Sequence, residues 1–208
     1  MIFRANHPQL LSGNKMSKIG VLNYGIGNYL SVKNMINHIG HDCSVIENKL
    51  DIKKFDKIIL PGVGAFDTAM DAINEYKLEL DNFVKRGGII LGICLGAQML
   101  GKKSDEGNYK GLGYIDMHSK SFSELGLNAN IGWKKVKSFM REDQDLMFYH
   151  LHNFYINLNE KVDNYENAHN ENFLYINAVK KNNIIGVQYH PEKSNSNGKR
   201  FFKWFCEL

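Results

Sequence analysis

Short, wholly apolar segments that alternate with helix-periodic segments constrain the fold of this chain more than any other feature. Residues 18–28, 56–62 and 87–93 each read as a buried strand, and glycine-containing turns lie at their ends. Residues 28–40 and 67–86 carry apolar side chains at helical spacing. Strands that are apolar on both faces and alternate with helices are typical of a parallel sheet covered on both sides. The sequence therefore predicts a three-layer α/β fold with a mostly parallel central sheet flanked by helices.

The pattern changes after residue 110. Residues 146–158 and 173–191 read as strands and hairpins, with Asn182-Asn183 as a hairpin tip. The C-terminal segment GKRFFKWFCEL has the spacing of an amphipathic helix. We therefore expect antiparallel strands to be added to the sheet in the C-terminal half of the chain.

The length of 208 residues fits one domain. Residues 1–16 lack the apolar core of a signal peptide, and Met16 is a plausible start of the folded part. We expect residues 1–16 to form a flexible extension and residues 17–208 a single domain. No stretch reaches the ~18 apolar residues of a membrane helix, so a membrane partner is not expected.

Charge and cysteine content exclude other classes of protein. The chain has 26 basic and 22 acidic residues, and its lysines are scattered, which is unlike a nucleic-acid-binding surface. Three cysteines without a CxxC pair do not form a disulfide framework. A small, odd number of cysteines favours a reducing compartment, and we expect a cytoplasmic protein.

The stretch GICLGAQML, residues 92–100, places Cys94 between Gly92 and Gly96, after an apolar strand and before a helix-like segment. This strand–turn–helix pattern predicts a nucleophile elbow, a sharp turn in which larger side chains two residues away would collide. Backbone amides at the start of the helix, beginning with Leu95, would favour a thiolate and could bind an oxyanion. A buried structural cysteine in a βα turn is the alternative that this stretch leaves open.

A cysteine nucleophile needs a base, and His190 is the strongest candidate among eight histidines. It closes an apolar strand, and Pro191 prevents the strand from continuing. In extended backbone, Glu192 would face the same side and could hydrogen-bond the far imidazole nitrogen. Strand ends of a parallel sheet gather at one edge, so we expect His190 to meet Cys94 there. A packed or solvated strand-end histidine is the alternative.

A glycine pair lies after another strand, where Gly62 and Gly64 flank Val63 in the loop PGVGAF. Glycines let backbone amides approach an anion closely, and an oxyanion at Cys94 needs such donors about 3 Å away. An ordinary strand-to-helix loop is the alternative interpretation of this pair.

No cofactor and no metal are predicted. The segment YGIGN is not a G-x-G-x-x-G fingerprint and no P-loop lysine follows it, which argues against a nucleotide. A zinc site that includes Cys94 and His190 stays an alternative, although no CxxC or HExxH spacing supports it. His150 and His152 point to one side of a strand, and core or surface packing is favoured for His150.

The order PGVGAF, GICLGAQML, VQYHPEKS resembles that of the class I (triad) glutamine amidotransferases, and the resemblance spans residues 18–208. Within this class, PGVGAF in place of a PGG loop resembles the glutaminase subunits of imidazole glycerol phosphate synthase. The YGIGN opening, the Gly132-Trp133 pair and the HPEKS run point to the same branch.

This resemblance implies a catalytic triad without a cofactor. Cys94 would attack the side-chain amide of glutamine, His190 would transfer protons, and Glu192 would orient His190. The resemblance further implies a set of substrate-binding positions, namely Gly62, Val63, Gly64, Leu95, Gln98, Glu106, Asn153 and Phe154.

The resemblance also implies a partner. The released ammonia would pass to a (β/α)8-barrel cyclase subunit in a heterodimer, which forms imidazole glycerol phosphate and aminoimidazole carboxamide ribotide in histidine biosynthesis. Asn28, Trp133 and Lys193 match positions at that interface.

Two departures from the family pattern bear on the acceptor. Asn153-Phe154 stands where the family commonly has Ser/Thr-Tyr, and Lys134 stands where it commonly has Asn. The first alternative is therefore a paralogous glutaminase that supplies ammonia for amidation of a surface-polysaccharide sugar. Two further alternatives are a binding module with a vestigial triad and a different elbow-cysteine enzyme, such as a peptidase.

Overall fold

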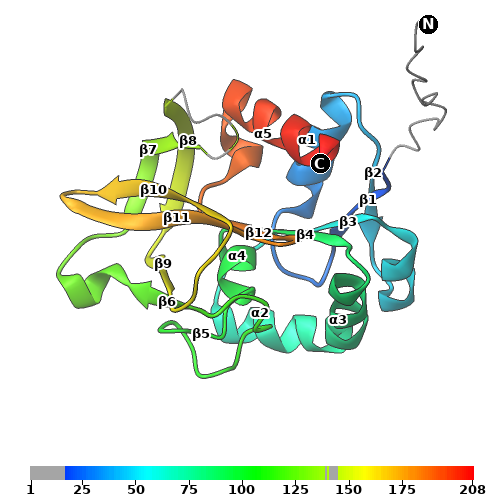
Figure 1. Cartoon of the computed structure of the whole chain (residues 1–208), viewed down its shortest axis with the longest axis horizontal. Coiled ribbons are helices and arrows are strands. Elements are labelled where there is room, and N and C mark those ends of the chain that lie inside the picture. Colours follow the sequence, from blue (N-terminus) through cyan, green and yellow to red (C-terminus); the bar gives the residue numbers. More distant parts are fainter. Residues whose placement is uncertain (1–16, 139, 141–144) are drawn as a thin grey trace, which may run out of the picture.

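The computed structural model describes residues 17–138, 140 and 145–208, so the predicted extension at residues 1–16 lies outside the described part (Figure 1). The described residues contain a ten-stranded sheet. Its path follows β2 (Cys43–Ile46), β1 (Ile19–Leu22), β3 (Lys57–Leu60), β4 (Ile89–Ile93), β12 (Ile184–Val187), β11 (Phe173–Lys181), β9 (Phe154–Leu158), β6 (Met117–Ser121) and β5 (Lys103–Ser104), with β10 (Asn164–Asn170) paired to β11.

The sheet has a parallel half and a largely antiparallel half. Strands β2, β1, β3, β4 and β12 are all parallel to one another. From β12 onward, β11, β9 and β6 pair antiparallel, and β5 returns parallel beside β6. The predicted fold, a mostly parallel sheet with antiparallel strands added in the C-terminal half, is confirmed.

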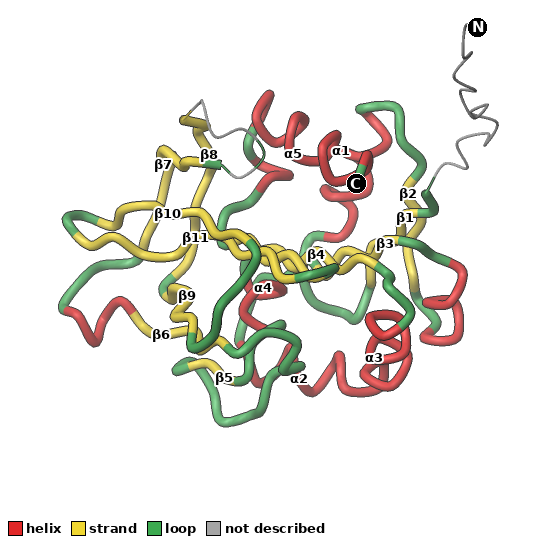
Figure 2. The backbone as a smooth tube through the Cα atoms, viewed as in Figure 1, coloured by secondary structure: helices red, strands yellow, loops and turns green. Residues whose placement is uncertain are grey.

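Helices cover both faces of the sheet (Figures 1 and 2). One face carries α1 (Tyr29–His38) and α5 (Asn195–Glu207), and the other carries α2 (Phe66–Ile73), α3 (Lys77–Lys85) and α4 (Leu95–Met99). The expectation of one helix over residues 67–86 is wrong. A 3₁₀ turn at Asn74–Tyr76 divides it, and this turn buries Tyr76, whose hydroxyl donates to the Glu47 carbonyl at 3.2 Å.

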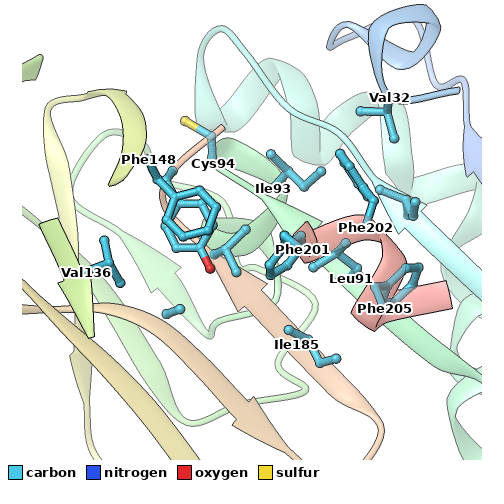
Figure 3. Packing of buried hydrophobic residues seen from close by; sticks show 14 of the residues in the cluster. Val32, Leu91, Ile93, Cys94, Val136, Phe148, Ile185, Phe201, Phe202 and Phe205 are labelled. Carbon is cyan, nitrogen blue, oxygen red and sulfur yellow. The ribbon is translucent and has the colours of Figure 1, made fainter. Parts of the chain in front are cut away.

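Aromatic side chains of α5 form much of the core on its face of the sheet. Phe201, Phe202 and Phe205 pack together with Leu91 and Ile185 of the two central strands (Figure 3). All five side chains are fully or almost fully buried. Packing of this kind holds β4 and β12, the strands that lead into the candidate site, in a fixed position.

Two strands form a separate sheet beside the main one. These are β7 (Asn130–Lys137) and β8 (Asp145–His152), which pair antiparallel over their whole length. A single bridge between Tyr149 and His190 ties β8 to the residues that follow β12. The predicted hairpin tip is also present, because Lys181 pairs with Ile184 and Asn182 has a φ of 51°.

Candidate active site

The carboxyl ends of the parallel strands bring the predicted site residues to one edge of the sheet. Strand β12 lies beside β4 in parallel register, with Val187 opposite Ile93. The Cys94 amide then donates to the Val187 carbonyl at 2.8 Å. Crevices outside the carboxyl ends of such strands are the usual ligand sites of open α/β sheets.

Cys94 occupies a strained turn between β4 and α4. Its φ of 53° and ψ of −110° are unusual for a residue with a side chain. A Cβ atom at Gly92 would lie 2.5 Å from the Gly96 carbonyl oxygen, and one at Gly96 would overlap the Leu60 carbonyl oxygen. The two glycines are therefore required by the close packing of the turn against its own helix and against β3.

The helix that follows Cys94 is shorter than the sequence suggests, because α4 spans only Leu95–Met99. Helix-dipole stabilisation of a thiolate is correspondingly limited. The environment of the Cys94 sulfur therefore depends more on groups from other elements, such as β8. Its sulfur is almost buried and lies 3.8 Å from the Leu151 carbonyl oxygen of β8 (Figure 3 shows Cys94 near Phe148 of that strand).

His190 and Glu192 form a buried ion pair. The distance between His190 Nδ1 and Glu192 Oε1 is 2.7 Å, and the two side chains are 2% and 3% exposed. Our premise that extended backbone would place them together is wrong. Pro191–Lys193 form a 3₁₀ turn, closed by the Lys193 amide donating to the His190 carbonyl at 3.0 Å, and this turn folds Glu192 back onto His190.

The second imidazole nitrogen is available for proton exchange. His190 Nε2 is buried and makes no hydrogen bond among the described residues. Burial lowers the pKa of His190, but stabilisation of the imidazolium by Cys94 and Glu192 outweighs burial and raises it to about 10. The arrangement can thus hold an imidazolium between a sulfur and a carboxylate.

The glycine loop lies directly against the elbow. Gly62 packs on Leu95 so closely that a Cβ atom would contact the Leu95 side chain at 2.7 Å. Val63 is 42% exposed and Gly64 has a φ of 115°. The loop backbone therefore lies against the first residues of α4, next to the elbow. Sequence reasoning missed Tyr24, whose hydroxyl donates to the Pro61 carbonyl at 2.5 Å at the base of this loop.

The other predicted substrate positions lie on α4, after β5 and at the junction of β8 and β9. Gln98 of α4 is buried and its Oε1 atom has no hydrogen-bond partner in the described part of the chain. Glu106 is exposed and hydrogen-bonds the Phe66 amide at the start of α2. Asn153 forms the bend between β8 and β9, and Phe154 is the first residue of β9. The Phe154 carbonyl accepts a hydrogen bond from His152 Nδ1 at 2.7 Å.

The three predicted partner residues are exposed. Asn28 caps α1, and its side chain accepts from the Ser31 amide at 3.1 Å. Lys193 lies in the 3₁₀ turn next to Glu192. Trp133 is 45% exposed and meets Tyr149 edge-on, with ring centroids 6.0 Å apart. The Tyr149 carbonyl accepts from the His190 amide at 2.8 Å. Tyr149 therefore connects Trp133 to the candidate base, His190.

Within the described residues, no group of three or more His, Cys, Asp or Glu side chains could hold a metal ion. No helix in that part of the chain has the length and apolarity to cross a membrane.

Comparison with known proteins agrees with this geometry. A family model described as glutamine amidotransferase class-I matches residues 21–207. The chain belongs to this family. Proteins named imidazole glycerol phosphate synthase subunit HisH 2, from Pseudomonas aeruginosa and Methanococcus maripaludis, are 35% and 36% identical to it. Each alignment covers 91% of this chain, and 99% and 98% of the respective relative.

Solved structures of glutamine amidotransferases share the fold. A structure titled glutamine amidotransferase matches with a TM-score of 0.69 at 17% identity, covering 91% of this chain and 99% of that chain. PurLQS from Thermotoga maritima matches with the same TM-score at 19% identity, covering 92% and 99%. This glutamine amidotransferase therefore has the architecture of its family around the elbow at Cys94.

Proposed function

We propose that residues 17–208 act as one catalytic domain, the glutaminase subunit of imidazole glycerol phosphate synthase. The observation that carries this proposal is the buried His190–Glu192 pair, 2.7 Å apart, at the end of the strand next to the Cys94 elbow. The names of the relatives at about 35% identity support the choice of this branch.

The chemistry follows from the positions of these groups. The Cys94 thiolate attacks the side-chain amide carbon of glutamine, and the amides of Leu95 and the Val63 loop stabilise the oxyanion. His190 gives its proton to the amide nitrogen, and the C–N bond breaks. Ammonia departs, and a glutamyl thioester remains on Cys94. A water molecule, deprotonated by His190, then attacks the thioester, and glutamate is released with return of the thiolate. Glu192 stabilises the imidazolium throughout.

Substrate recognition uses the groups around this edge. The unpartnered Oε1 of Gln98 and the exposed carboxylate of Glu106 suit the α-amino group of glutamine. Backbone groups at Asn153 and Phe154 suit its α-carboxylate. The shape of the binding site at these positions, rather than a cofactor, would set the preference for glutamine over other substrates.

An apolar surface beside the elbow supports a protein partner. Cross-strand neighbours on the outer face of the β7–β8 sheet include Ile131 with Leu151 and Trp133 with Tyr149. Ile131, Trp133 and Leu151 are 43–56% exposed, and the Leu151 carbonyl is the group 3.8 Å from the sulfur. Exposed apolar patches of this kind mark interaction sites. We infer that a (β/α)8 cyclase binds here and takes up the ammonia before it reaches water.

A cytoplasmic location fits the three cysteines, all of which are free thiols. It also fits a heterodimer that works on small metabolites.

The decisive experiment combines two measurements. Glutamate release from glutamine is assayed with and without the cyclase subunit, and the gene is tested for rescue of a histidine auxotroph that lacks this subunit. We expect partner-stimulated release, complete loss in Cys94→Ala, and rescue by the wild type only. Release without rescue would show that the ammonia serves another acceptor, and no release under either condition would refute the glutaminase itself.

A further inference from the structure

A chain of buried hydrogen bonds connects two carbonyl groups of the segment that passes the sulfur. Its members are polar side chains on three strands, Asn130 of β7, His150 and His152 of β8, and Tyr175 and Asn177 of β11. We propose that these five residues, here called the β8 clamp, are positioning residues that fix the glutamine-binding turn at Asn153-Phe154. This inference rests on the proposed glutaminase function.

The first half of the chain starts at the substrate turn. His152 Nδ1 donates to the Phe154 carbonyl at 2.7 Å. The other nitrogen, His152 Nε2, lies 3.1 Å from Asn130 Nδ2, and this amide nitrogen also donates to the Tyr175 hydroxyl at 2.6 Å. A neutral imidazole satisfies both contacts, since one ring nitrogen donates and the other accepts.

The second half returns to β8. The Tyr175 hydroxyl donates to the Asn177 side-chain oxygen at 3.2 Å, and the same oxygen lies 2.8 Å from His150 Nε2. His150 Nδ1 lies 3.0 Å from the Phe148 carbonyl oxygen, so the neutral ring donates either to Asn177 or to Phe148. The β8 clamp thus begins at residue 154 and ends at residue 148 of one continuous segment.

A β-bulge lies at Asn177. Glu166 of β10 pairs with Ala178, whereas the next residue, Asn167, pairs with Ile176, so Asn177 is the extra residue. A bulge of this kind redirects a side chain and is frequent beside active sites. Asn177 lies on the same side of β11 as Tyr175, two residues earlier, and the bulge places Ala178 on that side as well.

The polar side chains of the clamp are buried, which is energetically costly. Asn130, His150 and Asn177 are fully buried, and Tyr175 is 3% exposed. Burying polar groups of this size is costly, and apolar residues could fill the same space without that cost. Two atoms of the clamp, Asn130 Oδ1 and Asn177 Nδ2, are buried without a hydrogen-bond partner among the described residues. Burial also lowers the pKa values of His150 and His152 to about 4 and about 3, which keeps both rings neutral at neutral pH.

The segment held by the clamp, residues 148–154, lies next to the candidate catalytic and substrate-binding groups at three points. The Tyr149 carbonyl accepts from the His190 amide, the Leu151 carbonyl lies 3.8 Å from Cys94 Sγ, and the residues that follow His152 form the substrate turn. Among the described residues, no hydrogen bond joins a clamp side chain to the sulfur or to the His190–Glu192 pair. Its loss should therefore weaken glutamine binding while the intrinsic reactivity of Cys94 is retained.

The test is Tyr175→Phe, which removes one hydroxyl from the middle of the clamp and keeps the ring packed on Phe122 at 5.2 Å. Tyr155→Phe is the matched control, because Tyr155 packs on the same Phe122 ring at 5.1 Å and lies outside the clamp. Both are assayed for glutamine hydrolysis with the cyclase subunit present. Alkylation of Cys94 by iodoacetamide reports its reactivity without glutamine.

We expect KM for glutamine to rise about fivefold in Tyr175→Phe, the equivalent of one hydrogen bond, with kcat and the alkylation rate within about twofold of the wild type. An unchanged KM, or an equal rise in Tyr155→Phe, would overturn the inference. The wild type serves as the check on the proposed function, because absent hydrolysis there would refute the glutaminase and not the clamp alone.

A second pair of variants covers the case in which Tyr175→Phe does not fold. The amide of His152→Gln can still donate to the Phe154 carbonyl, whereas His152→Leu cannot. We expect the KM of His152→Gln to stay closer to that of the wild type than the KM of His152→Leu. Equal KM values in the two variants would contradict the positioning role.

Discussion

His190 Nδ1 lies 2.7 Å from Glu192 Oε1, and a 3₁₀ turn rather than a strand brings the two side chains together. Both are buried, so the carboxylate acts on the imidazolium with little screening by solvent. This contact fixes which ring nitrogen faces the carboxylate and leaves Nε2 for the substrate. The protonation of His190 should therefore depend strongly on Glu192.

Glu192→Gln is expected to lower the pKa of His190 from its raised value of about 10 toward the ordinary 6.5, because the stabilising negative charge is lost. At neutral pH a larger fraction of His190 is then neutral, and kcat for glutamine hydrolysis should fall by about 10²-fold. Imidazole NMR chemical shifts followed against pH measure the first effect, and steady-state kinetics measure the second. Glu207→Gln, at an exposed position, is the control and should change neither.

Trp133→Ala is expected to weaken association with the cyclase without impairing Cys94. Trp133 contributes a half-exposed ring to the β7–β8 surface, and aromatic side chains of this type often dominate interface energies. We expect Kd to rise by at least about tenfold by titration calorimetry, with an unchanged rate of iodoacetamide alkylation. Tyr165→Ala is a control at a similarly exposed aromatic residue on β10. An equal loss of affinity in both variants would argue against a specific role for Trp133.

The central part of the fold could be predicted because its signals are local. Strands such as Ile89–Ile93 are apolar on both faces, and only a sheet covered on both sides accommodates them. The Cys94 elbow could be predicted for a similar reason, since glycines two residues away on both sides of a cysteine are typical of a turn too tight for larger side chains. The structure places Cys94, His190 and Glu192 at one sheet edge, and their catalytic roles stay a prediction.

Other features depend on distant contacts that no local pattern encodes. Strand β10 has the sequence NYENAHN, which lacks apolar alternation, and its pairing with β11 alone makes it a strand. The proximity of the Leu151 carbonyl to Cys94 arises from the placement of β8 against the residues that follow β12. The interpretation of His150 and His152 as residues on one side of a strand was sound, but their partners on β7 and β11 could not be anticipated.

The neutral histidines predict an acid-sensitive fold. Burial lowers the pKa of His150 to about 4, whereas an unfolded histidine has its ordinary pKa near 6.5. Below pH 6.5 the unfolded chain binds a proton that the folded state does not, so stability is lost as pH falls toward 4. One such histidine costs about 2 kcal/mol between pH 6.5 and pH 5.

Urea unfolding at pH 7 and pH 5 checks this effect. We expect His150→Phe to lose less stability than the wild type across this interval, even if it is less stable at pH 7. His169→Asn, on the exposed side of β10, should keep the pH dependence of the wild type. Identical pH dependence in His150→Phe and the wild type would show that His150 is not the group responsible.

Gly96→Ala is expected to disrupt the elbow itself. The added Cβ atom would overlap the Leu60 carbonyl oxygen of β3, which is backbone and cannot move aside without shifting the strand. Overpacking of this kind costs about 1–3 kcal/mol, and movement of α4 would displace the Leu95 amide from the oxyanion.

Gly40→Ala is the control, since a Cβ atom there meets open space and only its φ of 87° opposes the change. Thermal unfolding should show the larger loss in Gly96→Ala, and glutamine hydrolysis should fall in that variant alone. Full activity in Gly96→Ala would mean that the close approach of the elbow to β3 is not needed for catalysis.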